Sequence, residues 1–354
     1  NTMIQFGLSG FAVPPGQSPG VMAKQIANLG VTHLRPVIRW DQIQPAADRW
    51  EWAAWDDFFN RLRVNGGRAW VVLHTGRAAW ATDHNYTKAG IATTTNYPPL
   101  DDESYGKFLR ALVRRYGALV DVWLIGNEMS EGYSYAGDAA SYLRSIETTA
   151  AAIRAVNPKA TIVLGAIPAF TAAMMVLADR IGDPAQRQWC IDYASRMQGQ
   201  PLSFEQIYAF LLRPENAYRV DFYRQAFSML PELNGLAGNV GPDLTRGARA
   251  ADVMWTFADQ MREHGGGEKP LWITEANPQI ADSNMAGQEF TAFARNAIGT
   301  GKLSGLAWLQ YADSTEYPNI GLVTSALRIK TAYLAYKNLI AEYRGAKKRG
   351  GFFT

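Results

Sequence analysis

The sequence is poor in the residues that build covalent or metal cross-links. It contains one cysteine, Cys190, and four histidines, at positions 33, 74, 84 and 264. A single cysteine excludes an internal disulfide and a cysteine-based metal site. The histidines show neither the His-x-His nor the His-Glu-x-x-His spacing that is typical of zinc sites. We therefore expect neither a metal nor a cofactor.

Long apolar runs and strong charge are also lacking. No run reaches the roughly 18 apolar residues of a membrane helix. The net charge of +3 is too small to indicate a nucleic-acid partner. The Gly-x-Ser-x-Gly motif of serine hydrolases is absent, and so is a phosphate-binding glycine loop. The sequence begins with Asn, so the lack of a signal peptide carries no information. We expect a secreted or extracytoplasmic location, and the sequence predicts no oligomeric state.

What is present is a recurring pattern of short apolar runs, each followed by a helical pattern. The runs are apolar throughout instead of alternating with polar residues, which is typical of strands that are buried on both faces. The predicted strands are Met3–Leu8, His33–Ile38, Ala69–Leu73, Val120–Ile125, Thr161–Leu164, Gly235–Ala237, Leu271–Thr274 and Gly305–Leu309.

The helical patterns between these runs have recognisable ends. Ser18 is placed to cap the first helix and Gly30 to end it. The predicted helices are Pro19–Leu29, Trp55–Asn65, Asp101–Tyr116, Ala139–Val156, Asp183–Met197, Phe204–Leu212, Arg219–Leu230, Arg246–His264, Ser283–Gly299 and Ala326–Tyr343.

Eight strands alternating with helices predict an α/β fold, a closed (β/α)8 barrel. A doubly wound open sheet is the alternative, but "GLSGFAVPPG" after the first strand is not its Gly-x-Gly-x-x-Gly turn. We expect residues 1–344 to form a single domain. Residues 345–354, with the cluster Lys347-Lys348-Arg349, are expected to form a flexible tail.

One connection is too long for a single helix, the one between Leu164 and Gly235. We predict a helical insertion at 168–216 in the fifth βα loop, on the face where barrel enzymes bind their ligands. We expect it to form one wall of a cleft.

Polar side chains follow several of the predicted strands where the apolar run ends. Residues just past the carboxyl ends of barrel strands point into the mouth of the barrel. Two of them are carboxylates, Glu128 in "WLIGNE" and Glu275 in "LWITEAN". The others are Arg35, His74, Asn127, Asn239, Trp308 and Gln310.

Two carboxyl groups across a sugar-sized gap are the tools of glycoside hydrolysis. One protonates the leaving oxygen, and the other attacks the anomeric carbon or activates water. Double displacement uses a separation of about 5–5.5 Å, and inversion one of roughly 6.5–9.5 Å. The sequence gives no distance, so it does not decide between them.

The two glutamate motifs resemble those of glycoside hydrolase clan A, the retaining (β/α)8 hydrolases. The ending "GLVTSALRIKTAYLAYKNLI" is similar to the closing helix of family 39 relatives. The resemblance implies that Glu128 is the acid/base and Glu275 the nucleophile. It implies that Asn127 binds the sugar 2-hydroxyl and that Arg35 supports the nucleophile. His74 resembles the strand-three histidine of cellulase-like members, and Trp308 a tryptophan that floors the sugar subsite.

The resemblance has one departure, and some candidates carry less specific signals. Many clan members have His-x-Tyr after strand six, where this chain has Asn239 and Gly241. Either another donor takes its place, such as Tyr311 or a tyrosine from a lid, or the nucleophile is tuned differently. Trp40 and Trp80 are candidate sugar platforms, and core packing is the alternative for both and for Trp308. The alternative for Arg35 is an ion pair in the bottom layer of the barrel, and for His74 it is a satisfied core histidine. Glu131 and Glu316 are predicted to be solvated loop acids.

The expected function is hydrolysis of a polysaccharide or oligosaccharide by double displacement. The expected partner is therefore a carbohydrate. Two alternatives remain, a transglycosidase that uses the same residues and a carbohydrate-binding barrel without turnover.

Overall fold

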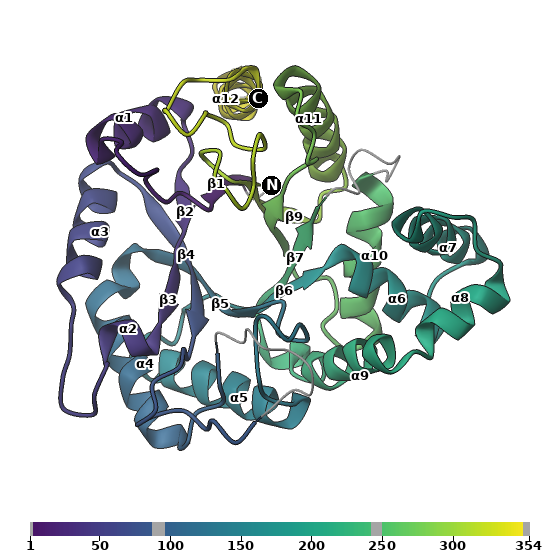
Figure 1. The fold of residues 1–354 in the computed structure, drawn as a ribbon, viewed down its shortest axis with the longest axis horizontal. Coiled ribbons are helices and arrows are strands. Elements are labelled where there is room, and N and C mark those ends of the chain that lie inside the picture. The colour runs from purple at the N-terminus through teal and green to yellow at the C-terminus, as the bar shows by residue number, and fades with distance from the viewer. Residues whose placement is uncertain (1–2, 87–95, 242–249, 350–354) are drawn as a thin grey trace. The chain divides into compact units, whose positions relative to one another are not determined.

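The computed structural model describes residues 3–86, 96–241 and 250–349 (Figure 1). Its strands are β1 (Gln5–Ser9), β2 (His33–Arg35), β3 (Val37–Arg39), β4 (Arg68–His74), β5 (Val120–Asn127), β6 (Ile162–Pro168), β7 (Gly235–Val240), β8 (Leu271–Ala276) and β9 (Leu303–Leu309).

The strands form one sheet in the order β2-β1-β9-β8-β7-β6-β5-β4-β3, and a further pairing of β2 with β4 closes it. Pairs such as β1 with β9 and β4 with β5 are parallel. The predicted second strand is divided at Pro36, which has no N–H to donate. Its carbonyl still accepts from the Val72 N–H at 2.9 Å, so β2 and β3 count as one barrel strand. The predicted (β/α)8 fold is confirmed.

The helices that alternate with these strands agree closely with the prediction. They are α1 (Pro19–Leu29), α2 (Trp40–Ile43), α3 (Ala53–Val64), α4 (Asp102–Tyr116), α5 (Ala139–Val156), α10 (Ala250–Glu263), α11 (Ser283–Gly299) and α12 (Thr331–Arg349), with 3-10 turns η1 (Gly117–Leu119) and η2 (Leu230–Glu232). Ser18 caps α1, and Gly30 ends it in the left-handed conformation at φ 90°.

Between β6 and β7 lie four helices, α6 (Ala169–Asp179), α7 (Pro184–Gln198), α8 (Phe204–Leu211) and α9 (Pro214–Phe227). The first three pack against one another (Figure 1). The sequence did not indicate α6, because its residues "AFTAAMMVLAD" are almost all buried and leave no polar face to produce a helical period. The boundary expected at Asn216 falls inside α9.

The last helix begins and ends later than predicted. Residues 325 and 326 form a turn, and next to it the Thr324 N–H donates to the Arg328 carbonyl at 2.9 Å. The helix begins where Ser283 of α11 accepts from the Ala332 N–H at 2.9 Å. It continues to Arg349, so the start of the expected tail is helical. Residues 350–354 of that tail, and residues 246–249 of the helix predicted before β8, lie outside the described residues.

Contacts divide the chain into two compact units. The first comprises Asn1–Arg35, Asn239–Trp255 and Leu271–Thr354. The second comprises Pro36–Gly238 and Thr256–Pro270. In the first unit, Tyr336 of α12 is fully buried, and its hydroxyl donates to the Gly7 carbonyl at 2.8 Å and to the Leu306 carbonyl at 3.2 Å. One side chain thus joins α12 to β1 and β9.

The two hydrogen bonds of the Tyr336 hydroxyl lead to a prediction about stability. Tyr336→Phe removes a buried donor and leaves carbonyls without it, so the free energy of unfolding should fall by about 1–2 kcal/mol. Tyr343→Phe, on the exposed end of the same helix, is the control and should change it by less. Chemical unfolding followed by circular dichroism measures both, and equal effects would contradict the assignment.

Candidate active site

In the first unit, Glu275 is held by a buried arginine. Glu275 is the next-to-last residue of β8, and its side chain is 21% exposed. Arg35 ends β2, and its side chain is only 3% exposed. Its Nη1 donates to Glu275 Oε1 at 2.6 Å and to Ser9 Oγ at 2.9 Å. The contact implied by the resemblance is present, and it fixes the carboxylate at the carboxyl end of its strand.

The neighbours of Glu275 are also fixed by side-chain hydrogen bonds. Thr274 Oγ1 donates to Asn239 Oδ1 at 2.9 Å, and both residues are buried. Asn277 donates from Nδ2 to the carbonyls of Leu309 and Ile320. The Asn239 side chain therefore helps to fix β8, the strand that carries Glu275. Asn277 was not among the predicted residues, and its place after the Glu-Ala pair carries no distinct signal.

Tyr311 is not the substitute donor that the sequence suggested. Its side chain is fully buried, and its hydroxyl donates to Gln25 Oε1 of α1 at 2.7 Å. Burial also raises the pKa of this hydroxyl well above its usual value. The expectation that Tyr311 contacts Glu275 is wrong because its only hydroxyl proton is used in the helix layer.

Trp308 is a core residue and not the floor of a sugar subsite. It is 1% exposed, and its ring lies 4.4 Å from that of Phe290 in α11 and 5.9 Å from that of Tyr336 in α12. Successive side chains of a strand point to opposite faces. Trp308 therefore points to the helices, and this prediction is wrong.

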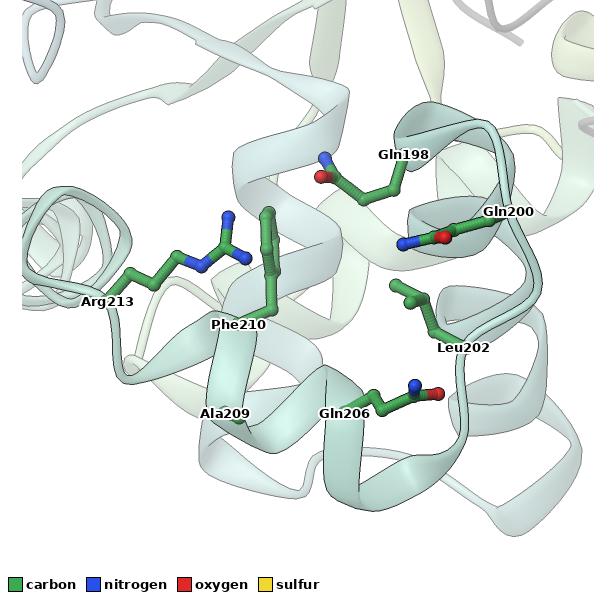
Figure 2. Close-up of a pocket in the computed structure, with 7 residues that line it drawn as sticks. All are labelled: Gln198, Gln200, Leu202, Gln206, Ala209, Phe210 and Arg213. Carbon is green, nitrogen blue, oxygen red and sulfur yellow. The ribbon is translucent and has the colours of Figure 1, made fainter.

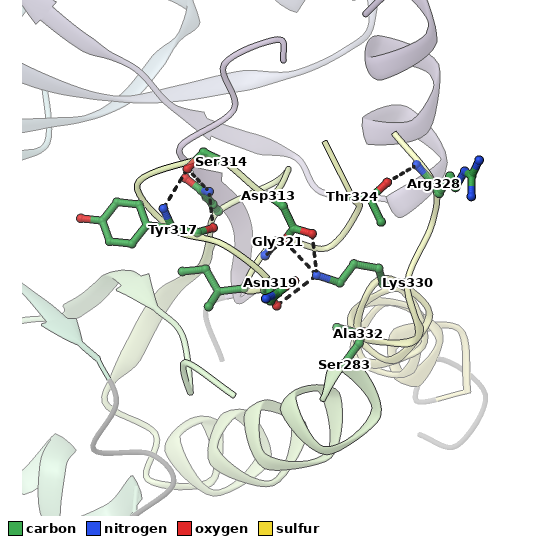
Figure 3. Close-up of polar contacts among 12 residues, drawn as sticks. Ser283, Asp313, Ser314, Tyr317, Asn319, Gly321, Thr324, Arg328, Lys330 and Ala332 are labelled. Atoms are coloured by element: carbon green, nitrogen blue, oxygen red, sulfur yellow. Dashed lines mark hydrogen bonds and ion pairs between the residues drawn. The ribbon is translucent and has the colours of Figure 1, made fainter. Parts of the chain in front are cut away.

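Gln310 directly follows β9, at the start of the loop to α12, and Figure 3 shows polar contacts of that loop. Its Nε2 donates to Ser314 Oγ at 3.0 Å. Lys330 Nζ contacts both carboxylate oxygens of Asp313, at 2.9 and 3.1 Å, and Asp313 Oδ1 also accepts from the Gly321 N–H. Glu316 is exposed at the tip of this loop, as predicted.

In the second unit, Glu128 follows β5 in an uncommon backbone conformation. Its φ is +50°, in the left-handed region that side chains other than glycine rarely adopt. Its N–H donates to the Ala166 carbonyl of β6 at 2.7 Å. The hydroxyl of Tyr133 donates to Glu128 Oε2. Tyr133 is half-exposed and was not predicted as a site residue.

Glycines make this end of β5 possible. Gly126 has φ +78°, and a Cβ there would lie 2.6 Å from the Met129 side chain. A Cβ at Gly165 of β6 would lie 2.2 Å from the Ile125 carbonyl. The close approach of β5 and β6 is therefore available only to glycine at these positions.

Asn127 and His74 end neighbouring parallel strands. Asn127 is the last residue of β5 and is aligned with Ala166 of β6. His74 is the last residue of β4 and is aligned with Arg39 of β3. Both residues are partly exposed, although the Nε2 atom of His74 is itself buried.

The two candidate platforms differ. Trp40 is fully buried, and its ring lies 5.2 Å from that of Tyr105 and 5.8 Å from that of Phe108. The prediction of a sugar platform is wrong for Trp40, because no face of the ring is open. Trp80 is half-buried, donates to the Gln44 carbonyl at 3.1 Å, and stays a candidate.

Glu131 is not a solvated loop acid. It is 8% exposed, and its oxygens accept from Nε and Nη2 of Arg219 on α9, both at 2.8 Å. The prediction failed because Arg219 lies far along the sequence and only the fold brings it near.

A separate cavity of about 240 Å³ lies among α7, α8 and the start of α9 (Figure 2). It is lined by amide side chains, such as Gln198 and Gln206, and by Arg213. The guanidinium carbon of Arg213 lies 5.1 Å from the centroid of the Phe210 ring. Gln206 also closes a capping box with Ser203. None of its lining residues is a carboxylate or one of the predicted site residues.

Within residues 3–86, 96–241 and 250–349, no group of three or more His, Cys, Asp or Glu side chains could hold a metal ion. No helix in the same residues is long and apolar enough to cross a membrane.

Comparison with solved structures places this fold. A family 39 glycoside hydrolase from Bacteroides cellulosilyticus WH2 is 15% identical with a TM-score of 0.64, over 96% of this chain and 64% of that one. Xylanase 10B from Thermotoga maritima is 13% identical with a TM-score of 0.61, over 97% of this chain and 96% of that one. The chain has the barrel fold of these glycoside hydrolases.

A GH5_18 protein from Bifidobacterium longum, in complex with Manβ1-4GlcNAc, is 12% identical with a TM-score of 0.62, over 97% of this chain and 79% of that one. No family model and no curated protein matches the chain. The chain spans less than two thirds of the family 39 enzyme. The resemblance to clan A is confirmed at the level of the fold.

The burial of Trp40 leads to a prediction about stability. Trp40→Ala should lower the free energy of unfolding by about 3–5 kcal/mol, because it empties a buried aromatic cluster. Trp80→Ala should lower it by less, because that ring is half-buried. Chemical unfolding compares the two, and equal small losses would contradict the core assignment of Trp40.

Proposed function

We propose that the chain is a retaining glycoside hydrolase with Glu128 as acid/base and Glu275 as nucleophile. The observation that carries the proposal is the ion pair of Glu275 with the buried Arg35. The guanidinium fixes the Glu275 carboxylate at the carboxyl end of its strand, which is where barrel enzymes place their catalytic residues. The likeness in fold to glycoside hydrolases adds support.

The proposed reaction has two steps. In the first, the Glu275 carboxylate attacks the anomeric carbon while Glu128 gives its proton to the departing oxygen, so that one glycosidic bond breaks and one ester bond forms. In the second, Glu128 takes a proton from water, whose oxygen attacks the anomeric carbon and releases Glu275. The proposal requires the two carboxyl groups to lie about 5–5.5 Å apart.

The other residues are proposed to bind the sugar. Asn127 and His74, at neighbouring strand ends, offer polar atoms to sugar hydroxyls, and Trp80 offers part of a ring face. We also propose that the helical segment 168–216 forms one wall of the cleft. Within it Phe170, Tyr193 and Phe210 pack on one another, while Phe204 and Tyr208 are half-exposed.

The proposed substrate is a polysaccharide or oligosaccharide, and a panel of polysaccharides assayed by reducing-end release identifies it. Among the structures of similar fold are a glucosidase and an exo-β-1,4-mannosidase, so β-glucans and β-mannans belong in the panel. A 2-fluoro sugar that adds mass to the protein distinguishes an enzyme from a carbohydrate-binding barrel. Product analysis at high acceptor concentration distinguishes a hydrolase from a transglycosidase.

The nucleophile assignment predicts the behaviour of two variants. Glu275→Gln and Glu275→Ala should lose activity by roughly 10⁴-fold or more. Gln keeps an oxygen that can accept from Arg35, whereas Ala leaves a buried guanidinium without this partner, so Ala should unfold at a lower temperature. Azide should restore activity to Ala and give a product of inverted configuration. Near-normal activity in Glu275→Gln would refute the assignment.

The acid/base assignment predicts a dependence on the leaving group. In Glu128→Ala, a dinitrophenyl glycoside needs no proton to depart, so the first step should survive and the glycosyl-enzyme should accumulate. A natural glycan needs the proton and should lose about 10²–10⁴-fold. Burst kinetics and steady-state rates on the two substrates measure this. Equal losses on both would count against an acid/base role.

A further inference from the structure

The loop that carries Glu128 is tied to α9 by a forked ion pair. Both carboxylate oxygens of Glu131 accept from Arg219, at 2.8 Å each, and Ser130 Oγ adds a weaker contact at 3.2 Å. Two parallel hydrogen bonds between a planar guanidinium and a carboxylate fix orientation as well as distance. Because Glu131 is almost fully buried, this pair is shielded from salt and water far more than a surface pair.

The ion pair continues into the helical segment. Arg219 Nη1 donates to Asn216 Oδ1 at 3.1 Å, and the buried Asn216 donates from Nδ2 to the Phe210 carbonyl at the end of α8, at 2.8 Å. A continuous chain of hydrogen bonds therefore runs from α8 through Arg219 to Glu131.

Within the loop, Glu131 is the residue on which the turn is built. Its N–H donates to the Glu128 carbonyl at 2.8 Å, and its own carbonyl accepts from the N–H groups of Ser134 and Tyr135 at 2.9 and 3.1 Å. Tyr133, whose hydroxyl donates to Glu128 Oε2, lies inside this turn. Holding Glu131 therefore holds both the backbone of Glu128 and the tyrosine that contacts its carboxyl group.

The charges around Glu128 are shared between the loop and α9. Burial raises the pKa of the Tyr223 hydroxyl well above its usual value, and the negative charges of Glu128 and Glu131 add to this effect. Titratable and charged groups face Glu128 and Glu131 from two sides. Those on the loop side are Tyr133 and Asp138, and those on α9 are Glu215, Tyr218, Arg219 and Tyr223.

We propose that Glu131 and Arg219 form a positioning pair for Glu128, which fixes the loop that carries the acid/base and keeps the charge beside it balanced. The inference rests on the proposed function. Neither residue transfers a proton. The pair joins the helical segment to the loop, so that a ligand held by that segment would find Glu128 already oriented.

The test is the pH dependence of kcat/KM on the glycan that the panel identifies. Activity needs protonated Glu128, so its ionisation sets the alkaline limb. Arg219→Met leaves the negative Glu131 beside Glu128, which opposes ionisation and should move this limb to higher pH. Glu131→Gln leaves the positive Arg219, which favours ionisation and should move it to lower pH. Each shift should be roughly half a pH unit or more.

The design includes a double variant and a matched control. Glu131→Gln combined with Arg219→Met removes both charges and should return the limb close to that of the wild type, with a lower rate because the loop is less fixed. Arg224 lies on the same helix and pairs with Asp179 instead of the loop. Arg224→Met should therefore leave the limb in place. Circular dichroism of each variant confirms that it is folded.

Opposite shifts in the two single variants support the proposal, because loss of structure alone would lower the rate in both without moving the limb in opposite directions. Shifts in the same direction, or no shift, in an enzyme that requires Glu128 would overturn the inference alone. Full activity of Glu128→Ala on the glycan would overturn the proposed function and this inference together.

Discussion

A guanidinium group shielded from water requires a carboxylate beside it, because an unpaired buried charge costs several kcal/mol. Arg35 is such a group, and Glu275 is the carboxylate that it contacts. Ser9 at the end of β1 accepts a second hydrogen bond from it, so the pair joins three strands of the first unit at their carboxyl ends. The position of Glu275 is therefore set by the stability of the barrel as much as by any reaction.

In the second unit, the candidate carboxylate Glu128 is held in a different way. The position of Glu128 depends on a turn held from α9 through Glu131 and from residues before α4 through Asn96. The buried Asn96 side chain accepts from the Gly76 N–H and donates to the Ser134 carbonyl.

The sequence was sufficient for the barrel but not for the direction of individual side chains. Runs such as Val120–Ile125 are apolar throughout, so they reveal a strand buried on both faces. The same property hides which face is which, and this is why Trp308 was placed toward the ligand although it packs against the helices. Trp40 and Glu131 failed for a related reason, since their partners, Phe108 and Arg219, are distant in sequence.

The backbone of Glu128 has a positive φ that its surroundings must impose. A non-glycine residue in the left-handed region costs on the order of 1–3 kcal/mol and persists only where its surroundings impose it. The β5–α5 turn does so through the hydrogen bonds of Glu131, and the ion pair on α9 prevents that turn from relaxing. The strain at Glu128 and the burial of Glu131 are thus two parts of one arrangement, which holds a carboxyl group where its backbone alone would not leave it.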